Sequence, residues 1–266
     1  AGSLLGVAVN RAKFSFPVVK GVYNYCQTIF NFPCAFIPCI TIAIIPAITN
    51  SLTLQDRRGV RSVQNSSLRL MGLIAMPCAV GLIVLAEPIV ALLGGYTGAN
   101  LTLATKLMAI LGVAVVFNSI VLMTDAIMQA HNHAVIPVIN TLIGGVVKVI
   151  VNYILVGIPA LGIVGAPVGT LVCYIFITAL DVIAMRRSIT SRPAIFKNLV
   201  RPLAASAIMG AATWVVWQVV DRVLPSATLA CLAALAFAVV LYVVLAVCLR
   251  CVTYADCMLL PKGEKI

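Results

Sequence analysis

Long apolar runs separated by short polar segments set the pattern of this chain. An apolar helix of about 20 residues covers the roughly 30 Å hydrocarbon core of a bilayer, so each run is long enough to cross a membrane. The runs lack the polar–apolar alternation of an outer-membrane β-barrel. The seven predicted spans are residues 22–49, 70–93, 103–130, 134–156, 161–184, 202–220 and 227–249. The sequence therefore predicts an all-α, polytopic transmembrane helical bundle.

The composition agrees with a membrane protein. Of the 266 residues, 62% are hydrophobic and 9% are charged, and the mean hydropathy is +1.14. A soluble domain has about 25% charged and 45–50% apolar residues. The net charge of +11 does not indicate a nucleic-acid partner, because the basic residues lie in short segments between spans and not along one stripe.

The basic residues are distributed unevenly about the predicted spans. Twelve of the 18 Lys and Arg residues fall on one side of the membrane and five on the other, while Lys148 lies within a span. Basic segments of membrane proteins face the cytoplasm in excess. We therefore expect a multi-pass protein of the cytoplasmic (inner) membrane, with a cytoplasmic C-terminus and the segment around Tyr96 outside.

The predicted spans divide the chain into five parts. Residues 1–10 reach only about 15 Å as a helix, half a membrane, which indicates that the chain begins inside a helix. Within the first complete span we expect a bend near Pro33 or Pro38, where proline removes a helix donor. Residues 51–69 are polar and predict a short amphipathic helix at the membrane surface. The five parts are the end of a preceding span with an outer loop (1–21), a five-span bundle (22–185), a cytoplasmic basic loop (186–201), two C-terminal spans (202–249) and a cytoplasmic tail (250–266).

Lys148 is the most unusual residue, because it lies well inside the apolar run 134–156. At helical spacing it shares a face with Thr141, Gly144 and Asn152. An ionisable group at that depth costs several kcal/mol unless it faces protein or a wet cavity, which makes it a candidate site. The alternative is a structural Lys that is neutralised by a neighbour or extends along its stem toward the interface.

The run 103–130 carries a polar stripe, in which Asn118, Asp125 and Gln129 share one helical face with Leu122. Asp125 is the only acid that the pattern places deep in a span. Its predicted axial offset from Lys148 is about 14 Å, which is too long for direct contact between antiparallel neighbours. We expect the two charges to bracket a wet cavity at two heights.

Neither a metal site nor an enzyme active site is predicted. His131 and His133 lie two residues apart in a tight turn without further ligands, and this pattern favours a polar hairpin. Nine cysteines are scattered, mostly within apolar runs, and the lone CxxC of Cys248 and Cys251 has no fourth ligand nearby. The seven acids are spread along the chain and form no catalytic constellation.

Three long stretches carry a resemblance to a known family. They are YNYCQTIFNFPCAFIPCITIAIIPAITNSL (23–52), SSLRLMGLIAMPCAVGLIVLAEPIVALLGG (66–95) and DAIMQAHNHAVIPVINTLIGGVVKVIVNYILVGIPALGIVGAPVGT (125–170). The chain resembles polysaccharide-biosynthesis flippases of the stage V sporulation protein B type. These belong to the multidrug/oligosaccharidyl-lipid/polysaccharide (MOP) flippase superfamily and are related to the lipid II flippases. The resemblance implies the second lobe of a MATE-like fold with two extra C-terminal spans.

The resemblance also implies a function, namely translocation of an undecaprenyl-pyrophosphate-linked sugar or peptidoglycan precursor by alternating access. A diphosphate head group needs cations and hydrogen-bond donors in a low-dielectric cavity. The expected substrate-binding residues are Lys148, Asn152, Arg11, Asn31 and Asn118. Asp125 and Gln129 are expected to contact a coupling ion or a sugar hydroxyl. The expected partners are membrane lipids and a first lobe of the same protein, with no cofactor beyond a coupling cation and no nucleic acid.

Other readings remain open at this point. A drug/cation antiporter of the same superfamily needs acidic cavity residues, of which the pattern offers only Asp125. A membrane-embedded glycan-modifying enzyme needs a catalytic acid or His cluster at an interface. For Asn31, a hydrogen bond between helices is as reasonable as a cavity role. A purely structural scaffold does not readily explain Lys148 at mid-depth.

Overall fold

The computed structural model describes residues 16–158, 161–223 and 227–249, and these ranges contain helices and no strand. Seven helical stretches of the described chain are long and apolar enough to cross a membrane, as the sequence predicts. The helices are α2 (Phe16–Cys34), α3 (Phe36–Thr53), α4 (Arg57–Val84), α5 (Ala86–Gly94), α6 (Gly98–Ala130), α7 (Val135–Gly157), η1 (Gly162–Val164), α8 (Gly165–Ser188), α9 (Ile195–Val223) and α10 (Ala227–Cys248).

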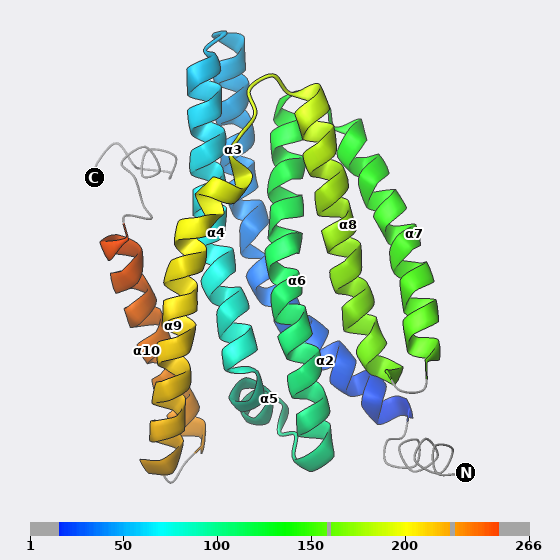
Figure 1. The fold of residues 1–266 in the computed structure, drawn as a ribbon, viewed down its shortest axis with the longest axis vertical. Helices are drawn as coiled ribbons and strands as arrows, with labels where there is room; N and C mark the ends of the chain where they lie inside the picture. The colour runs from blue at the N-terminus through cyan, green and yellow to red at the C-terminus, as the bar shows by residue number, and fades with distance from the viewer. Residues whose placement is uncertain (1–15, 159–160, 224–226, 250–266) are drawn as a thin grey trace.

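Helix α6 is the centre of the bundle. It packs against α2, α3, α4, α5 and α8, while α7 packs mainly on α8 and α10 mainly on α9 (Figure 1). In the most apolar stretch of α6 67% of the residues are buried, against 17% in α7 and 22% in α10. The bundle is therefore a core around α6, with α7 and α10 at its two edges.

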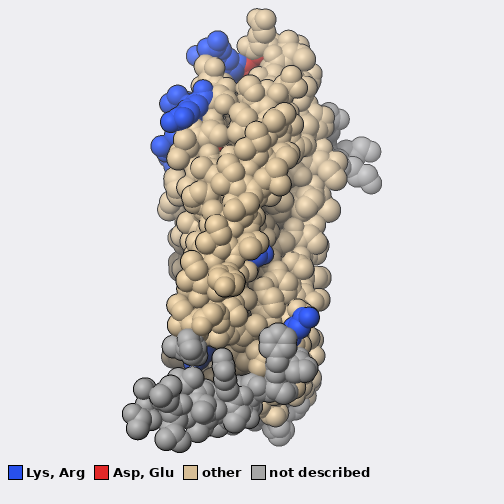
Figure 2. Space-filling model, turned by 90° about the vertical axis from the view of Figure 1, so that its right-hand side faces the viewer, with Lys and Arg blue, Asp and Glu red and all other residues tan. Residues whose placement is uncertain are grey.

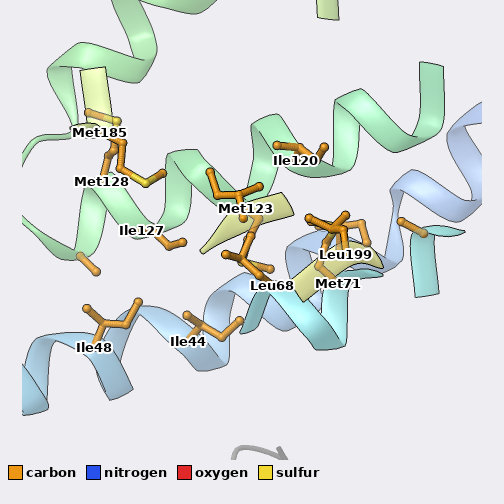
Figure 3. Close-up of a cluster of buried hydrophobic side chains, with 14 of the residues drawn as sticks. Ile44, Ile48, Leu68, Met71, Ile120, Met123, Ile127, Met128, Met185 and Leu199 are labelled. Atoms are coloured by element: carbon orange, nitrogen blue, oxygen red, sulfur yellow. The ribbon is translucent and has the colours of Figure 1, made fainter. Parts of the chain in front are cut away.

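The interior is packed by branched aliphatic and Met side chains from five helices. In the cluster of Figure 3, Ile44 and Leu68 from α3 and α4 meet Met123 and Ile127 from α6. Met185 of α8 and Leu199 of α9 belong to the same cluster. Unbranched Met side chains fill irregular gaps between helices that cross at different angles.

The predicted bend in the first span is confirmed. The helix is interrupted at Ala35, between α2 and α3, and the two halves run in different directions (Figure 1). The Ala35 amide still donates to the Asn31 oxygen at 3.0 Å, but Pro38 has no N–H to continue the ladder across the break. Proline therefore redirects the chain here without ending the span.

The predicted surface helix within residues 51–69 is wrong, because α4 runs without interruption from Arg57 to Val84. Asp56 caps it, and its Oδ1 accepts hydrogen bonds from the amides of Arg58 and Gly59 at 3.0 Å. Gln64 and Ser67 look like surface residues in the sequence, yet both are 0% exposed. They turn inward and begin the packed part of a spanning helix.

The basic connection after α8 is also shorter than the predicted loop 186–201. Helix α8 continues to Ser188 and α9 starts at Ile195, so only six residues, 189–194, connect them. Asn65 of α4 fixes this connection, because its Oδ1 accepts from the Ala194 amide at 3.0 Å and from Asn198 Nδ2 at 2.7 Å. Helices α8 and α9 therefore both extend into the segment that the sequence predicts as a loop.

The turn between α6 and α7 is a polar hairpin, as predicted. Gln64 of α4 lies under it, and its Nε2 donates to Nε2 of His131 at 2.7 Å. Burial lowers the pKa of His131 below its usual value, and the neighbouring charge of His133 lowers it further. The folded protein therefore favours a neutral His131.

Small residues bring α7 and α8 into close contact. A Cβ added to Gly144 would meet the buried side chain of Ile177, and one added to Gly165 would lie 2.8 Å from the backbone of Leu155. Gly169 leaves room for the side chain of Asn152. Gly144, Gly165 and Gly169 therefore allow α7 and α8 to approach closely.

The two neighbouring glycines of α7 provide a test of this contact. We expect Gly144→Leu to lower the free energy of unfolding by about 1–3 kcal/mol, the usual cost of overpacking a core. Gly145 has nothing within 4 Å of an added Cβ, so Gly145→Leu should stay within about 1 kcal/mol of the wild type. Unfolding of both variants in detergent measures the difference. Equal stability of the two variants would show that α7 does not pack on α8 through Gly144.

The neutral His131 predicts a pH dependence of stability. Because the pKa is lower in the folded than in the unfolded state, the unfolded chain takes up the proton first as the pH falls below about 6.5. The wild type should therefore be less stable at pH 5.5 than at pH 7.5, roughly one unit on either side of that value. His131→Asn should flatten this dependence, and His133→Asn should retain most of it. A thermal midpoint of His131→Asn that falls with pH as steeply as that of the wild type would refute the assignment.

Candidate functional site

The most polar place inside the bundle lies where α6, α7 and α8 meet, toward the α6–α7 hairpin. Asp181 of α8 is 0% exposed. Asn140 of α7 donates from Nδ2 to Asp181 Oδ1 at 2.8 Å. Thr124 of α6 donates to Asp181 Oδ2 at 3.5 Å, and its hydroxyl also lies 2.9 Å from the Ile120 and Val121 oxygens. One carboxyl group is thus bound from two neighbouring helices.

Asp125 completes this site, and its carboxyl group lies close enough to that of Asp181 for the two to interact. A hydrogen bond between these two carboxyl groups would require a proton on one of them, because an ionised carboxylate only accepts. Asp125 Oδ1 is also buried and has no hydrogen-bond partner in the described part of the chain. The pair can therefore hold one proton between two oxygens, or exchange that proton for a small cation. We call Asp125 and Asp181 the acid pair.

The expectation that Asp125 is the only deep acid is therefore wrong. Asp181 lies near the end of its apolar run, five residues before Arg186, where an acid is usually interfacial and paired with basic neighbours. The structure turns it inward instead, toward Asn140 and Thr124. One signal in the sequence could have revealed Asp181, because it follows an uninterrupted apolar segment. An acid inside a membrane span is a candidate functional residue by default.

Lys148 lies on the edge of the contact between α7 and α8. It is half-buried, and its ammonium group is close enough to the Cys173 thiol for an electrostatic interaction. The predicted polar face is not one environment, because Thr141 is exposed while Gly144 is buried against α8. Asn152, one turn further along, has a buried Oδ1 without a hydrogen-bond partner among the described residues. Lys148 and Asn152 thus form a second polar position on α7.

The acid pair and Lys148 are separate. Asn140, which contacts Asp181, precedes Lys148 by eight residues on α7, which is about 12 Å along the helix. No ion pair joins Lys148 to Asp125 within the ranges that the structure describes. The prediction that these two charges do not touch agrees with this arrangement.

The other predicted site residues are dispersed. Asn31 is exposed at the last turn of α2, and Gln129 is exposed at the last turn of α6. Asn118 is 9% exposed and interacts with the Cys34 thiol, beside the break between α2 and α3. Arg11 lies outside the described residues. The structure brings Asp125 together with residues that the sequence did not single out, and it leaves the binding roles of the predicted set as proposals.

Charge is concentrated at one end of the bundle. The α3–α4, α6–α7 and α8–α9 connections all lie at the upper end in Figure 1. Figure 2 shows Lys and Arg gathered at that end, whereas charged side chains are sparse over the middle of this face. In the part of the chain that is described, no three His, Cys, Asp or Glu side chains come together as they would around a metal ion.

Comparisons with known proteins agree with this architecture. Residues 5–233 match the family described as Lipid II flippase MurJ. The uncharacterized membrane protein YabM of Bacillus subtilis (strain 168) is 24% identical over 172 residues, which are 64% of this chain and 30% of that protein. A solved structure, the inward-facing conformation of a multidrug resistance MATE family transporter of the MOP superfamily, is similar with a TM-score of 0.52.

The structural likeness to the MATE family transporter extends over 82% of this chain and 55% of that one at 14% identity, so it shows the fold alone. It confirms the expected MATE-like helical architecture in a multi-pass membrane protein. The family match is to the lipid II flippases, to which the resemblance pointed as relatives, and the narrower stage V sporulation protein B type is not established. Because the match covers most of its length, the chain belongs to the Lipid II flippase MurJ family.

Proposed function

We propose that this chain supplies one lobe of a flippase that moves an undecaprenyl-pyrophosphate-linked sugar or peptidoglycan precursor across the cytoplasmic membrane by alternating access. Membership of a lipid II flippase family supports a lipid-linked substrate. Within the molecule, the observation that carries the proposal is an apolar groove. A substrate with a long hydrocarbon chain needs an apolar surface to receive that chain.

The groove lies between α2, α4, α9 and α10 and has a volume of about 370 Å³. Phe32 and Pro33 form one wall, at the end of α2, and Leu235 and Val239 of α10 form the opposite one. At one side of the groove the Tyr242 hydroxyl donates to the Leu73 oxygen at 2.9 Å, which joins α10 to α4. An apolar groove of this kind suits a lipid chain better than a hydrophilic drug.

Lys148 and Asn152 are the proposed contacts for the pyrophosphate. An ammonium group inside a spanning helix attracts an anionic head group into a partly desolvated site, where charge-assisted hydrogen bonds are roughly twice as strong as neutral ones. The Nδ2 group of Asn152 can donate a hydrogen bond to a phosphate oxygen, and its buried Oδ1, which has no partner among the described residues, can accept one from a sugar hydroxyl of the same substrate. Asn31, Asn118 and Arg11 are proposed as further contacts with the substrate.

The acid pair is the proposed coupling site. Asp125 and Asp181 with Asn140 and Thr124 present oxygen atoms from three helices, so release of their proton or cation can change how α6, α7 and α8 pack. Gln129 lies one turn beyond Asp125, toward the hairpin, and is the proposed contact for a sugar hydroxyl. Coupling requires that the cation and the substrate each bind the two conformations of the transporter with different affinities.

A drug/cation antiporter is the second candidate function. The acid pair favours it, because it supplies a second deep acid that the sequence pattern alone did not reveal. A cationic drug could bind a carboxylate inside the bundle, and the similar solved structure is of a multidrug resistance transporter. The two candidates differ in the sign of the substrate charge, and therefore in which residue is essential.

Lys148 tests the head-group site. In the complete protein, Lys148→Ala should reduce translocation of the lipid-linked precursor roughly 10- to 100-fold, because a hydrogen bond to a charged group is worth about 1.5–3 kcal/mol. Lys148→Arg should retain partial function, since the charge survives while its geometry changes. Complementation of cells depleted of their own flippase, at matched protein levels, measures the effect.

Lys106→Ala is the matched control, because Lys106 is an exposed cation near the start of α6. It should complement as the wild type does. Full complementation by Lys148→Ala would make Lys148 structural and would remove it from the proposed site.

Asp181→Asn tests the coupling site, because it removes the charge while Asn140 can still donate to the new amide oxygen. We expect the dependence of transport on an imposed proton or sodium gradient to fall at least about fivefold, within the usual range of coupling between two sites. Transport by proteoliposomes under each gradient measures it. Glu87→Gln, an exposed acid in the first turn of α5, is the control and should keep the full dependence.

The outcomes also separate the two candidate functions. Unchanged gradient dependence in Asp181→Asn would place coupling elsewhere. Export of a cationic drug that needs Asp181 but not Lys148, with no movement of the lipid-linked precursor, would favour the antiporter.

A further inference from the structure

Four arginines line a cleft at the basic end of the bundle. Arg57, Arg58 and Arg61 come from the first turns of α4, and Arg192 comes from the connection between α8 and α9. The hydroxyl-bearing residues Thr190 and Ser191 complete the lining, and the cleft has a volume of about 440 Å³. We call this site the arginine cleft.

The positive charge of the arginine cleft is not compensated within the described part of the protein. All four arginines are exposed, and none of them has a side-chain ion pair there. Asp56 is the nearest acid in sequence, but its carboxylate caps α4 by accepting from the Arg58 and Gly59 amides. Guanidinium groups that repel one another without a bound anion favour a ligand of negative charge.

The two backbone segments that form the cleft are tied together. Asn65, one turn below Arg61 on α4, accepts from the Ala194 amide at 3.0 Å and from Asn198 Nδ2 at 2.7 Å. These bonds tie the connection that carries Arg192 to the helix that carries the other three arginines. A preorganised cluster loses less conformational entropy when it binds a ligand than four independent side chains do.

The position of the cleft indicates the source of the anion. Helix α4 has 28 residues, about 42 Å of helix, and its apolar part ends at Val84. A hydrocarbon core of roughly 30 Å measured from that end leaves the turn with Arg57 and Arg61 in the adjoining 5–8 Å head-group layer or just beyond it. Arginines at this height lie closer to the lipid phosphates than to anions in bulk solution.

We propose that the arginine cleft binds the phosphate head group of an anionic phospholipid in the leaflet at the basic end. Guanidinium groups bind phosphate oxygens in a bidentate manner, and the hydroxyls of Thr190 and Ser191 supply further donors. A lipid bound there joins the start of α4 to the connection between α8 and α9. It thereby links α4 to α8 and α9, which lie far from α4 in the sequence. This site is distinct from Lys148 and from the apolar groove.

The purified protein in detergent tests this proposal, with phosphatidylglycerol titrated and bound lipid counted by native mass spectrometry. The double variant Arg61→Gln/Arg192→Gln should bind phosphatidylglycerol about thirtyfold more weakly. Each basic residue near an anionic surface contributes about 1 kcal/mol, and 1.4 kcal/mol is a factor of ten. Binding of zwitterionic phosphatidylcholine should not change.

Lys197→Gln/Arg201→Gln is the matched control, because it removes the same charge from exposed positions at the same end and outside the arginine cleft. It should bind phosphatidylglycerol nearly as the wild type does. Asn65→Ala keeps every arginine but releases the connection, and it should weaken binding severalfold. An equal loss in the two double variants, with no effect of Asn65→Ala, would reduce the cleft to diffuse surface charge and refute the proposal.

A competition experiment separates the two sources of phosphate. Inorganic phosphate at millimolar concentration should leave phosphatidylglycerol bound to the wild type. If phosphate displaces the lipid, and the double variant loses phosphate binding while it retains the lipid, the cleft serves a soluble anion and the proposal fails.

Discussion

No water is available inside a bilayer to bind a free backbone group, and this constraint governs the whole structure. It makes every described element of the bundle helical, and it makes each break in a helix a special position. The breaks at Ala35 and Leu85 are such positions. Pro33 and Leu85 both line the apolar groove, so both interruptions of the helices lie beside it. Irregular backbone in this bundle thus lies beside a surface that a lipid chain could cover.

Apolar periodicity predicts the spans well because the length of a membrane helix is fixed by the bilayer and not by its neighbours. It fails at residues 51–69, where the polar composition indicates a surface segment. Gln64 and Ser67 are buried there because α6 and its hairpin cover them, and a hydroxyl such as that of Ser67 can bind the Val63 oxygen of its own helix. Small polar residues are compatible with a packed membrane helix, and the sequence does not reveal which side is covered.

The candidate site was predictable only in part, for a similar reason. Lys148 stands out because a charge within an apolar run is a local signal. Asp181 does not, because its role depends on Asn140 and Thr124, which come from two other helices. Helical spacing shows which residues share a face, but not which faces meet. The acid pair depends on the contact between α7 and α8, which the glycines between these helices make possible.

In the proposed flippase, the separation of Lys148 from the acid pair would allow one lobe to bind an anionic substrate and a cation together. If Lys148 paired with Asp181, each would neutralise the other and neither would attract a ligand. Lys148 follows Asn140 by eight residues, so these two residues lie about 12 Å apart along α7. Asn140 is hydrogen-bonded to Asp181, so a change at the acid pair would act directly on the helix that carries Lys148. Because α7 is the least buried spanning stretch of the described chain and packs mainly on α8, it can shift without disrupting the core around α6. In the proposed mechanism, a change at the acid pair would reach the head-group position through the tilt or register of α7, without contact between the two sites.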